Sequence, residues 1–391
     1  MRSGLEVLLD DPARWRGLKV GLCCNHTAVD GAYRHAIDRL REAGVPLVRL
    51  FGPEHGVRAT AQDMEGVDEH RDPVSGLPVV SLYGDDEASL RPDPAHLEDL
   101  DVVLFDIQDI GARYYTYQAT LGFIMEAAGK VGTRVVVLDR PNPLGGVSVE
   151  GNTVGAGFES FVGAYPIAVR HGMTVGELGR YFVKHLGVVC DLEVIKCEGW
   201  ERSMWFDDGD LPWVYPSPNM PTLDTAVVYP GMCLFEATTL SEGRGTTRPF
   251  HLVGAPWLDP QDVVARARRI AERAGLEGVA FRPAAFNPGF QKHTGASCRG
   301  LEVHVTDRDR LNTLLLGLVV LEATYRSDPD AFGWREEPYE FIADVPAIDL
   351  LTGSAECREA LESGQPLEQL LGRWEPQRQA FLSRRASVLL Y

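Results

Sequence analysis

Residues 46–58 read PLVRLFGPEHGVR, and they carry the clearest sign of the architecture. The apolar run Leu47–Phe51 predicts a buried strand, which Gly52-Pro53 ends because proline fixes its own φ and keeps the preceding residue out of the helical region. The turn that follows holds a carboxylate, Glu54, and an imidazole, His55. Loops just past the ends of buried strands are where α/β enzymes keep their catalytic groups. The alternative is a turn whose carboxylate only binds backbone amides.

Four further apolar runs end in polar clusters in the same way. They are Lys19–Cys24, Leu77–Leu82, Asp101–Phe105 and Arg134–Leu138. Helical patterns lie between several of these runs, at Tyr33–Ala43, His96–Leu100 and Thr116–Lys130. Strands that alternate with helices predict βαβ units and a parallel sheet. Because the carboxyl ends of parallel strands share one edge of the sheet, the five polar clusters should converge on one crevice.

The length of the chain, 391 residues, predicts two domains rather than one core. Glycines crowd residues 143–163, where the periodic pattern fades, and we place the boundary at residue 155. Beyond it, Thr174 and Glu177 have the spacing of a helix capping box. Further helices are predicted at residues 260–274, 308–325, 357–364 and 376–387, and short strands at 191–196, 226–229 and 234–237. Residues 1–155 are therefore predicted to form an α/β domain, and residues 156–391 an α+β domain.

The composition, 45% apolar and 24% charged, is that of a soluble globular protein. A net charge of −18 argues against nucleic acid as a partner, because nucleic acid requires basic surface. We also expect no membrane insertion, since no apolar run is long enough to span a bilayer. The N-terminus lacks the pattern of a signal peptide, and the seven cysteines include no CxxC pair, which favours free thiols and a cytoplasmic location.

Two loops of the second half are rich in polar groups. Residues 213–222 contain three prolines and are predicted to form a loop rather than a helix or strand. Residues 241–250 place Arg244 and Arg248 among glycines and threonines. Glycines let backbone N–H groups turn toward an anion, and an arginine fork matches a carboxylate or phosphate, so this loop predicts an anionic substrate. For Arg248 or Glu242 taken alone, an Arg–Glu ion pair with a purely structural role explains the residue as well as anion binding does.

Several familiar cofactor motifs are absent from the sequence. No GxGxxG follows the first strand, and neither a Walker A loop nor an HExxH motif is present, so we expect no cofactor. A metal site built from His26, Glu54, His55 and His70 is conceivable, but those spacings are not diagnostic, and we favour a metal-free site.

Seven motifs of this chain resemble those of the bacterial exo-β-N-acetylmuramidase family, NamZ. They are Phe51–Gly56, Ser81–Gly84, Phe105–Asp109, Asp139–Pro143, His171–Thr174, Pro216–Pro221 and Ser241–Thr247. The resemblance runs in order from about residue 19 to residue 307. It implies a Rossmann-like N-terminal domain, an active site in the cleft against the second domain, and release of N-acetylmuramic acid from the non-reducing ends of peptidoglycan fragments. The chain departs from the family in one respect: many relatives carry an export signal, and this sequence lacks the pattern of one.

By position, the catalytic glutamate of the family falls on Glu54, which we expect to act as general acid and base. N-acetylmuramic acid also carries a 2-acetamido group whose oxygen can attack the anomeric carbon. In that case Asp106 or Asp109 would orient the acetamido group, with Tyr83 or Tyr115 as its hydrogen-bond partner. If the mechanism instead uses two protein carboxylates, Asp109 is one candidate for the second.

Glu242 is the other candidate for a second carboxylate. The lactyl carboxylate of the sugar requires a cation, for which Arg58, Arg113 and Arg244 are the candidates. The remaining residues expected to bind substrate are His55, Gln108 and Asn219. The expected partner is thus a peptidoglycan-derived saccharide, bound by a monomer or a homodimer.

The sequence is also compatible with two other classes of protein. A non-catalytic sugar-binding or muropeptide-binding protein would keep the arginines and aromatic residues without needing an acid at Glu54. A metal-dependent hydrolase would gather His26, His55 and acidic partners around an ion.

Overall fold

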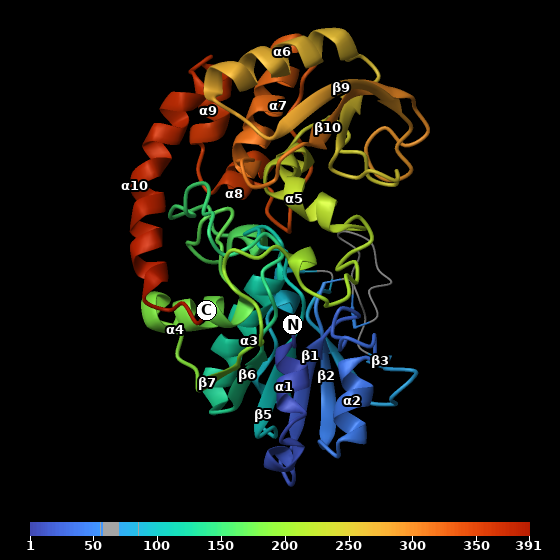
Figure 1. Ribbon diagram of the computed structural model, residues 1–391, viewed down its shortest axis with the longest axis vertical. Helices are drawn as coiled ribbons and strands as arrows, with labels where there is room; N and C mark the ends of the chain where they lie inside the picture. The colour runs from blue at the N-terminus through green and yellow to red at the C-terminus, as the bar shows by residue number, and fades with distance from the viewer. Residues whose placement is uncertain (55, 58–69, 85) are drawn as a thin grey trace.

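The computed structural model describes residues 1–54, 56–57, 70–84 and 86–391. In Figure 1 a sheet flanked by helices forms the lower part of the molecule, and a smaller sheet with its own helices forms the upper part. The α/β class with an α+β second domain is therefore confirmed.

The first sheet has seven strands in the order β3-β4-β2-β1-β5-β6-β7. They are β1 (Val20–Cys24), β2 (Leu47–Gly52), β3 (His70–Arg71), β4 (Pro78–Ser81), β5 (Val102–Asp106), β6 (Arg134–Leu138) and β7 (Leu192–Ile195). Every neighbouring pair is parallel except β3 and β4. Without the short strand β3, this is the strand order of a Rossmann-type sheet: β2 and β4 extend the sheet to one side of β1, and β5, β6 and β7 extend it to the other.

Helices cover both faces of this sheet. They are α1 (Gly4–Leu8), α2 (Ala36–Glu42), α3 (Tyr117–Val131) and α4 (Val175–Leu186). Successive side chains of a strand point to opposite faces, so Leu104 packs in the same cluster as residues of α1 and α2, while Val103 packs with residues of α3 and α4. The predicted capping box is confirmed, because the Thr174 hydroxyl accepts from the N–H of Glu177 and the carboxylate of Glu177 accepts from the N–H of Thr174.

The second domain is built on a three-stranded antiparallel sheet with order β8-β10-β9. The strands are β8 (Leu252–Ala255), β9 (Val279–Phe286) and β10 (Cys298–Val305). Its helices are α5 (Leu223–Met232), α6 (Pro260–Ala274), α7 (Thr313–Ser327), α8 (Ala347–Thr352), α9 (Glu356–Glu362) and α10 (Leu367–Ala386). In Figure 1 α10 runs down the side of the molecule from the second domain to α4 of the first.

Two segments predicted as strands are helical. Residues 226–229 lie in α5, and residues 234–237 lie in a 3₁₀ helix, Cys233–Ala237. The side chain of Thr222 caps α5 by accepting from the N–H of Thr225. In a short run that is apolar on every side, the hydrophobic period does not distinguish a helix from a strand. Here the capping residue favours the helix.

The first sheet also extends past residue 155. Strand β7 pairs with β6, so a segment assigned to the second domain by sequence completes the first sheet. Helix α10 begins nine residues earlier than predicted, at Leu367, and continues through Pro376. Much of this helix is exposed, and its carbonyl groups there can bond to water where the proline removes an N–H donor.

Candidate active site

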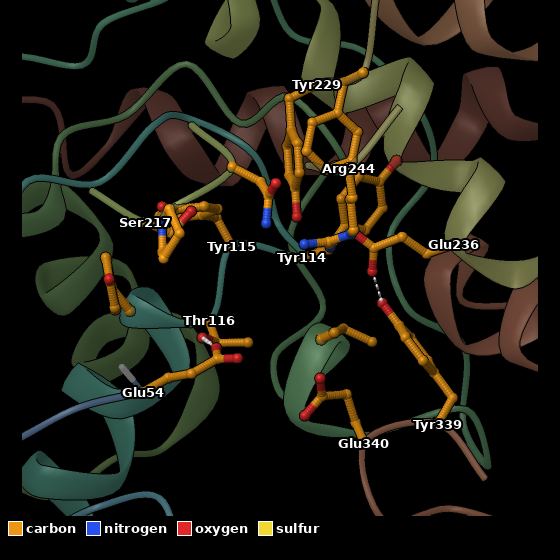
Figure 2. A pocket seen from close by; sticks show the side chains of 15 residues that line it. Glu54, Tyr114, Tyr115, Thr116, Ser217, Tyr229, Glu236, Arg244, Tyr339 and Glu340 are labelled. Carbon is orange, nitrogen blue, oxygen red and sulfur yellow. Dashed lines mark hydrogen bonds and ion pairs between the residues drawn. The ribbon is translucent and has the colours of Figure 1, made fainter. Parts of the chain in front are cut away.

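A pocket lies at the carboxyl edge of the parallel sheet, between the two domains. Its walls come from the loop after β2, the start of α3, the loop before α5, the loop before β8 and the segment around residue 340. It has an empty volume of about 520 Å³, part of which is open to solvent. Figure 2 shows the side chains that surround it.

Glu54 extends into this pocket from the turn after β2. Its side chain is only 6% exposed. The hydroxyl of Thr116, the N-cap residue of α3, donates to Glu54 Oε2 over 2.7 Å. This contact joins the ends of two elements and fixes the orientation of the carboxylate.

Aromatic rings form one wall of the pocket. Tyr115 packs edge-on against Tyr117 and Tyr229, with ring centroids 5.1 and 5.7 Å apart. The hydroxyl of Tyr114 donates to the carbonyl of Pro230 over 2.6 Å. Burial raises the pKa of Tyr115 and Tyr229 well above the usual value, so their hydroxyls stay protonated and can donate hydrogen bonds.

Arg244 is a cation of the pocket lining, and its guanidinium reaches toward the middle of the pocket (Figure 2). Its Nη2 lies 2.5 Å from Glu236 Oε1, and its Nε lies 2.9 Å from Glu242 Oε1. Lys292 Nζ lies 2.6 Å from the other oxygen of Glu242. Burial opposes ionisation of Glu242, but the two cations outweigh it and lower the pKa of this carboxyl.

Two pocket residues, Tyr339 and Glu340, come from a segment without a recognisable sequence motif. Tyr339 donates its hydroxyl hydrogen to Glu236 Oε2 over 2.7 Å. Glu340 lines the pocket and is 4% exposed. The sequence around them has no helical or strand period, and two of their hydrogen-bond partners, Glu236 and Tyr83, are far away along the chain, so only the fold reveals them.

Several predicted site residues are brought together here. Glu54, Tyr115, Asn219 and Arg244 line the pocket. Asn219 Oδ1 also accepts from the N–H of Gly245 over 3.4 Å, which joins the two polar loops of the second half.

Two more predicted residues stand directly behind the lining. The Tyr83 hydroxyl donates to Glu340 Oε2 over 3.3 Å, and Glu242 holds Arg244. His55 and Arg58 lie outside the described residues.

Other predicted site residues have structural partners away from the pocket lining. Asp106 accepts two hydrogen bonds from Arg140, of 2.5 and 3.1 Å. The side-chain amide of Gln108 donates to the carbonyls of Asp109 and Pro141. Asp109 accepts from the N–H of Gly111 over 2.7 Å, and the same oxygen lies 3.4 Å from His171 Nε2.

Arg113, predicted to bind the lactyl carboxylate, is completely buried. Its guanidinium donates to the carbonyls of Asn152, Ile167 and Leu351 over 2.7 to 3.0 Å. Burial lowers its pKa to about 10. Since Leu351 belongs to α8, this arginine joins the second domain to loops of the first.

Among the residues that the structure describes, no group of three or more histidine, cysteine or acidic side chains is arranged to hold a metal ion. His26 Nε2 contacts the carbonyl of Tyr215. Within the same part of the chain, no helix is long and apolar enough to cross a membrane.

Comparison with known proteins places this geometry in a family. Sequence models described as exo-β-N-acetylmuramidase NamZ match the chain, the N-terminal one over residues 20–224 and the C-terminal one over residues 227–391. The peptidoglycan β-N-acetylmuramidase NamZ of Bacillus subtilis (strain 168) is 40% identical over 393 positions, which cover 100% of this chain and 91% of the relative.

Crystal structures of two DUF1343 family proteins from Bacteroides fragilis share the fold. Their TM-scores are 0.87 at 33% identity and 0.75 at 26% identity, and each match covers 100% of this chain and 98% of the other. The fold, the carboxylates of the pocket and the matches together define a glycosidase with a Rossmann-like domain. The chain belongs to the exo-β-N-acetylmuramidase NamZ family.

Proposed function

We propose that this protein is an exo-acting glycoside hydrolase that releases N-acetylmuramic acid from the non-reducing end of peptidoglycan-derived glycans or muropeptides. The observation that carries the proposal is the placement of Glu54. A buried carboxylate extends from the turn after β2 into a pocket built by both domains, in a chain that matches the NamZ family over nearly its whole length.

In this proposal Glu54 is the general acid. As the bond between the anomeric carbon and the glycosidic oxygen breaks, Glu54 gives its proton to the departing oxygen. The anomeric carbon finally receives the hydroxyl group of a water molecule, and the proton released from that water restores Glu54 either directly or through solvent. The hydrogen bond from Thr116 holds the carboxyl group in the orientation that this transfer requires.

The pocket also has groups suited to the rest of the sugar. In this proposal the guanidinium of Arg244, which lines the pocket, binds the lactyl carboxylate that distinguishes muramic acid from glucosamine. The protonated hydroxyls of Tyr115 and Tyr229 can donate to sugar oxygens, and their rings supply an apolar surface. The loop with Ser217 and Asn219 closes one side, as an exo-acting enzyme requires.

A direct test compares a chromogenic aryl β-N-acetylmuramide with the matching β-N-acetylglucosaminide. We expect kcat/KM for the muramide to exceed that for the glucosaminide by at least about tenfold, the scale of one charge-assisted contact. If the protein hydrolysed neither compound, the proposal would be contradicted.

Activity should also survive prolonged treatment with EDTA, since the proposed catalytic groups are protein carboxyls. A loss of activity that one metal restores would favour a metal-dependent hydrolase.

A further inference from the structure

Glu340 lies at the tip of a tight turn that projects into the pocket. Tyr339 and Ile342 exchange two backbone hydrogen bonds, of 2.9 and 3.0 Å, which close a turn with two central residues. Both central residues, Glu340 at φ 48° and Phe341 at φ 68°, have left-handed backbone conformations. Two positive φ values at these positions are the mark of a type I′ turn.

The choice of residues in this turn is unfavourable for folding. Type I′ turns favour Asn-Gly or Gly-Gly, because a side chain other than that of asparagine or aspartate is strained at positive φ. Here the chain places Glu340 and Phe341 instead. Strained residues of this kind persist where the surrounding structure holds them and where their side chains serve a function.

Contacts on both sides hold the turn against the pocket. The Tyr83 hydroxyl donates to Glu340 Oε2 over 3.3 Å, and the ring of Phe341 lies 5.9 Å from the ring of Tyr83. Tyr339 is held by Glu236 on the opposite side. The turn is therefore fixed before any substrate arrives.

The direction of Glu340 agrees with a role in the reaction. In Figure 2 its carboxylate and that of Glu54 extend from different walls toward the same space. Burying a carboxylate so completely is costly, so its position calls for an explanation beyond packing. Asp106 and Asp109, the acids expected near this role from sequence, are held by Arg140 and by His171 with Gly111.

We propose that Glu340 is the second catalytic carboxylate, and this inference rests on the proposed glycosidase function. While Glu54 protonates the departing oxygen, the nucleophile forms the new bond to the anomeric carbon and gives one proton to Glu340. With water as nucleophile that proton comes from its O–H, and solvent then restores both carboxyl groups. With the 2-acetamido oxygen it comes from the amide N–H and returns when water, deprotonated by Glu54, opens the cyclic intermediate.

The test uses two variants of this residue and one control in the full-length protein. Glu340→Gln keeps the shape of the side chain, and Glu340→Asn introduces a residue that tolerates the left-handed conformation. Glu337→Gln removes an exposed carboxylate from the same segment. For each protein, kcat and KM are measured on the aryl β-N-acetylmuramide, and Tm is measured by calorimetry.

We expect kcat to fall about 10²- to 10⁴-fold in both Glu340 variants, the usual scale for losing a group that transfers a proton, with KM within a fewfold of the wild type. The Tm of Glu340→Asn should equal or exceed that of the wild type, because the turn loses its strain. Glu337→Gln should match the wild type in both measurements.

Three results would overturn the inference. Turnover within threefold of the wild type in the Glu340 variants would do so while leaving the proposed function intact. A marked fall of Tm in both variants would assign Glu340 to structure, whatever the loss of activity. Failure of the wild type to hydrolyse any glycoside offered would overturn this inference together with the proposed function.

Discussion

Glu54 and Arg244 show how single residues acquire their roles from partners distant in the sequence. Glu54 has an ordinary position in a turn, and the hydroxyl of Thr116 and the walls of the pocket make it a candidate acid. Arg244 presents its guanidinium because Glu236 and Glu242 hold it from behind. Each assignment leads to a substitution whose effect is specific.

Glu54→Gln removes the proton that the leaving group requires and keeps the size of the side chain. We expect kcat to fall about 10²- to 10⁴-fold on a natural disaccharide, with the fold intact. The loss should be smaller on an aryl muramide with an acidic phenol, since that leaving group needs less protonation. Measured turnover close to that of the wild type on the disaccharide would remove Glu54 from the mechanism.

Arg244→Met removes the charge expected to meet the lactyl carboxylate. We expect kcat/KM for the aryl muramide to fall about 10- to 100-fold more than that for the glucosaminide, which lacks this carboxylate. Arg248→Met serves as the control, because Arg248 lies on the same loop and pairs with Glu302. This variant should leave the ratio of kcat/KM for the two sugars unchanged. Equal losses on both sugars in Arg244→Met would assign this arginine to structure alone.

Among the elements, the parallel sheet could be predicted from the sequence, but the helical conformation of residues 226–229 and 234–237 could not. The strands of a parallel sheet are short buried runs, so Leu47–Phe51 and Arg134–Leu138 could be recognised by composition alone. Residues 226–229 have a similar composition, yet they fold as part of α5. Local composition could not separate the two cases, because tertiary packing and a helix cap decide between them.

The same limit applies to the site. Glu54, Tyr115 and Arg244 follow recognisable strand ends or a glycine-rich loop, and all three line the pocket. Glu340 could not be found, since its place depends on a turn held by Tyr83 and on contacts between the two halves of the chain. Arg113 was misplaced for the converse reason, because nothing in its neighbourhood shows that backbone carbonyls bind its guanidinium.

The C-terminal residue, Tyr391, contacts the buried carboxyl group of Asp139, and the stability that this region contributes should depend on pH. Asp139 follows β6 and accepts hydrogen bonds from Tyr391 and Thr174, each 2.7 Å long. Burial raises the pKa of Asp139 to about 6, well above its value in an unfolded chain. A raised carboxyl pKa adds stability that is complete at low pH and is lost as the pH rises through about 6.

Asp139→Asn should therefore flatten the pH dependence of unfolding. Between pH 5 and pH 8 the free energy of unfolding should fall by about 1–2 kcal/mol more in the wild type than in the variant. This is the free energy that corresponds to the interval of about one pH unit between pH 5 and the pKa of about 6. Denaturant unfolding at several pH values measures this difference, with exposed Asp191→Asn as the control. Parallel curves for wild type and Asp139→Asn would contradict the raised pKa.

At the scale of the whole molecule, the pocket exists only while the two domains hold one another. Arg113 contributes to this contact by binding carbonyls of Asn152 on one side and Leu351 of α8 on the other. Helix α10 adds a second connection, since it spans from the second domain to α4. Glu54 belongs to the first domain and Glu340 to the second, so their relative positions depend on these contacts.

Arg113→Met should destabilise the protein without changing its choice of sugar. Removing the guanidinium leaves three buried carbonyl groups without their donor, which should cost about 3–5 kcal/mol of unfolding free energy. Calorimetry should show a lower Tm, and the ratio of muramide to glucosaminide kcat/KM should remain that of the wild type. A selective loss of the muramide would return Arg113 to the substrate site.

The proposed activity is the removal of N-acetylmuramic acid from the non-reducing end of the glycan. Its most direct test is product analysis by mass spectrometry on the tetrasaccharide MurNAc-GlcNAc-MurNAc-GlcNAc, using wild type and Glu54→Gln. The wild type should first release free N-acetylmuramic acid and leave a trisaccharide, and the variant should release it far more slowly. Disaccharides as the first products would show cleavage inside the chain and contradict exo action, and equal rates for the two proteins would contradict catalysis by Glu54.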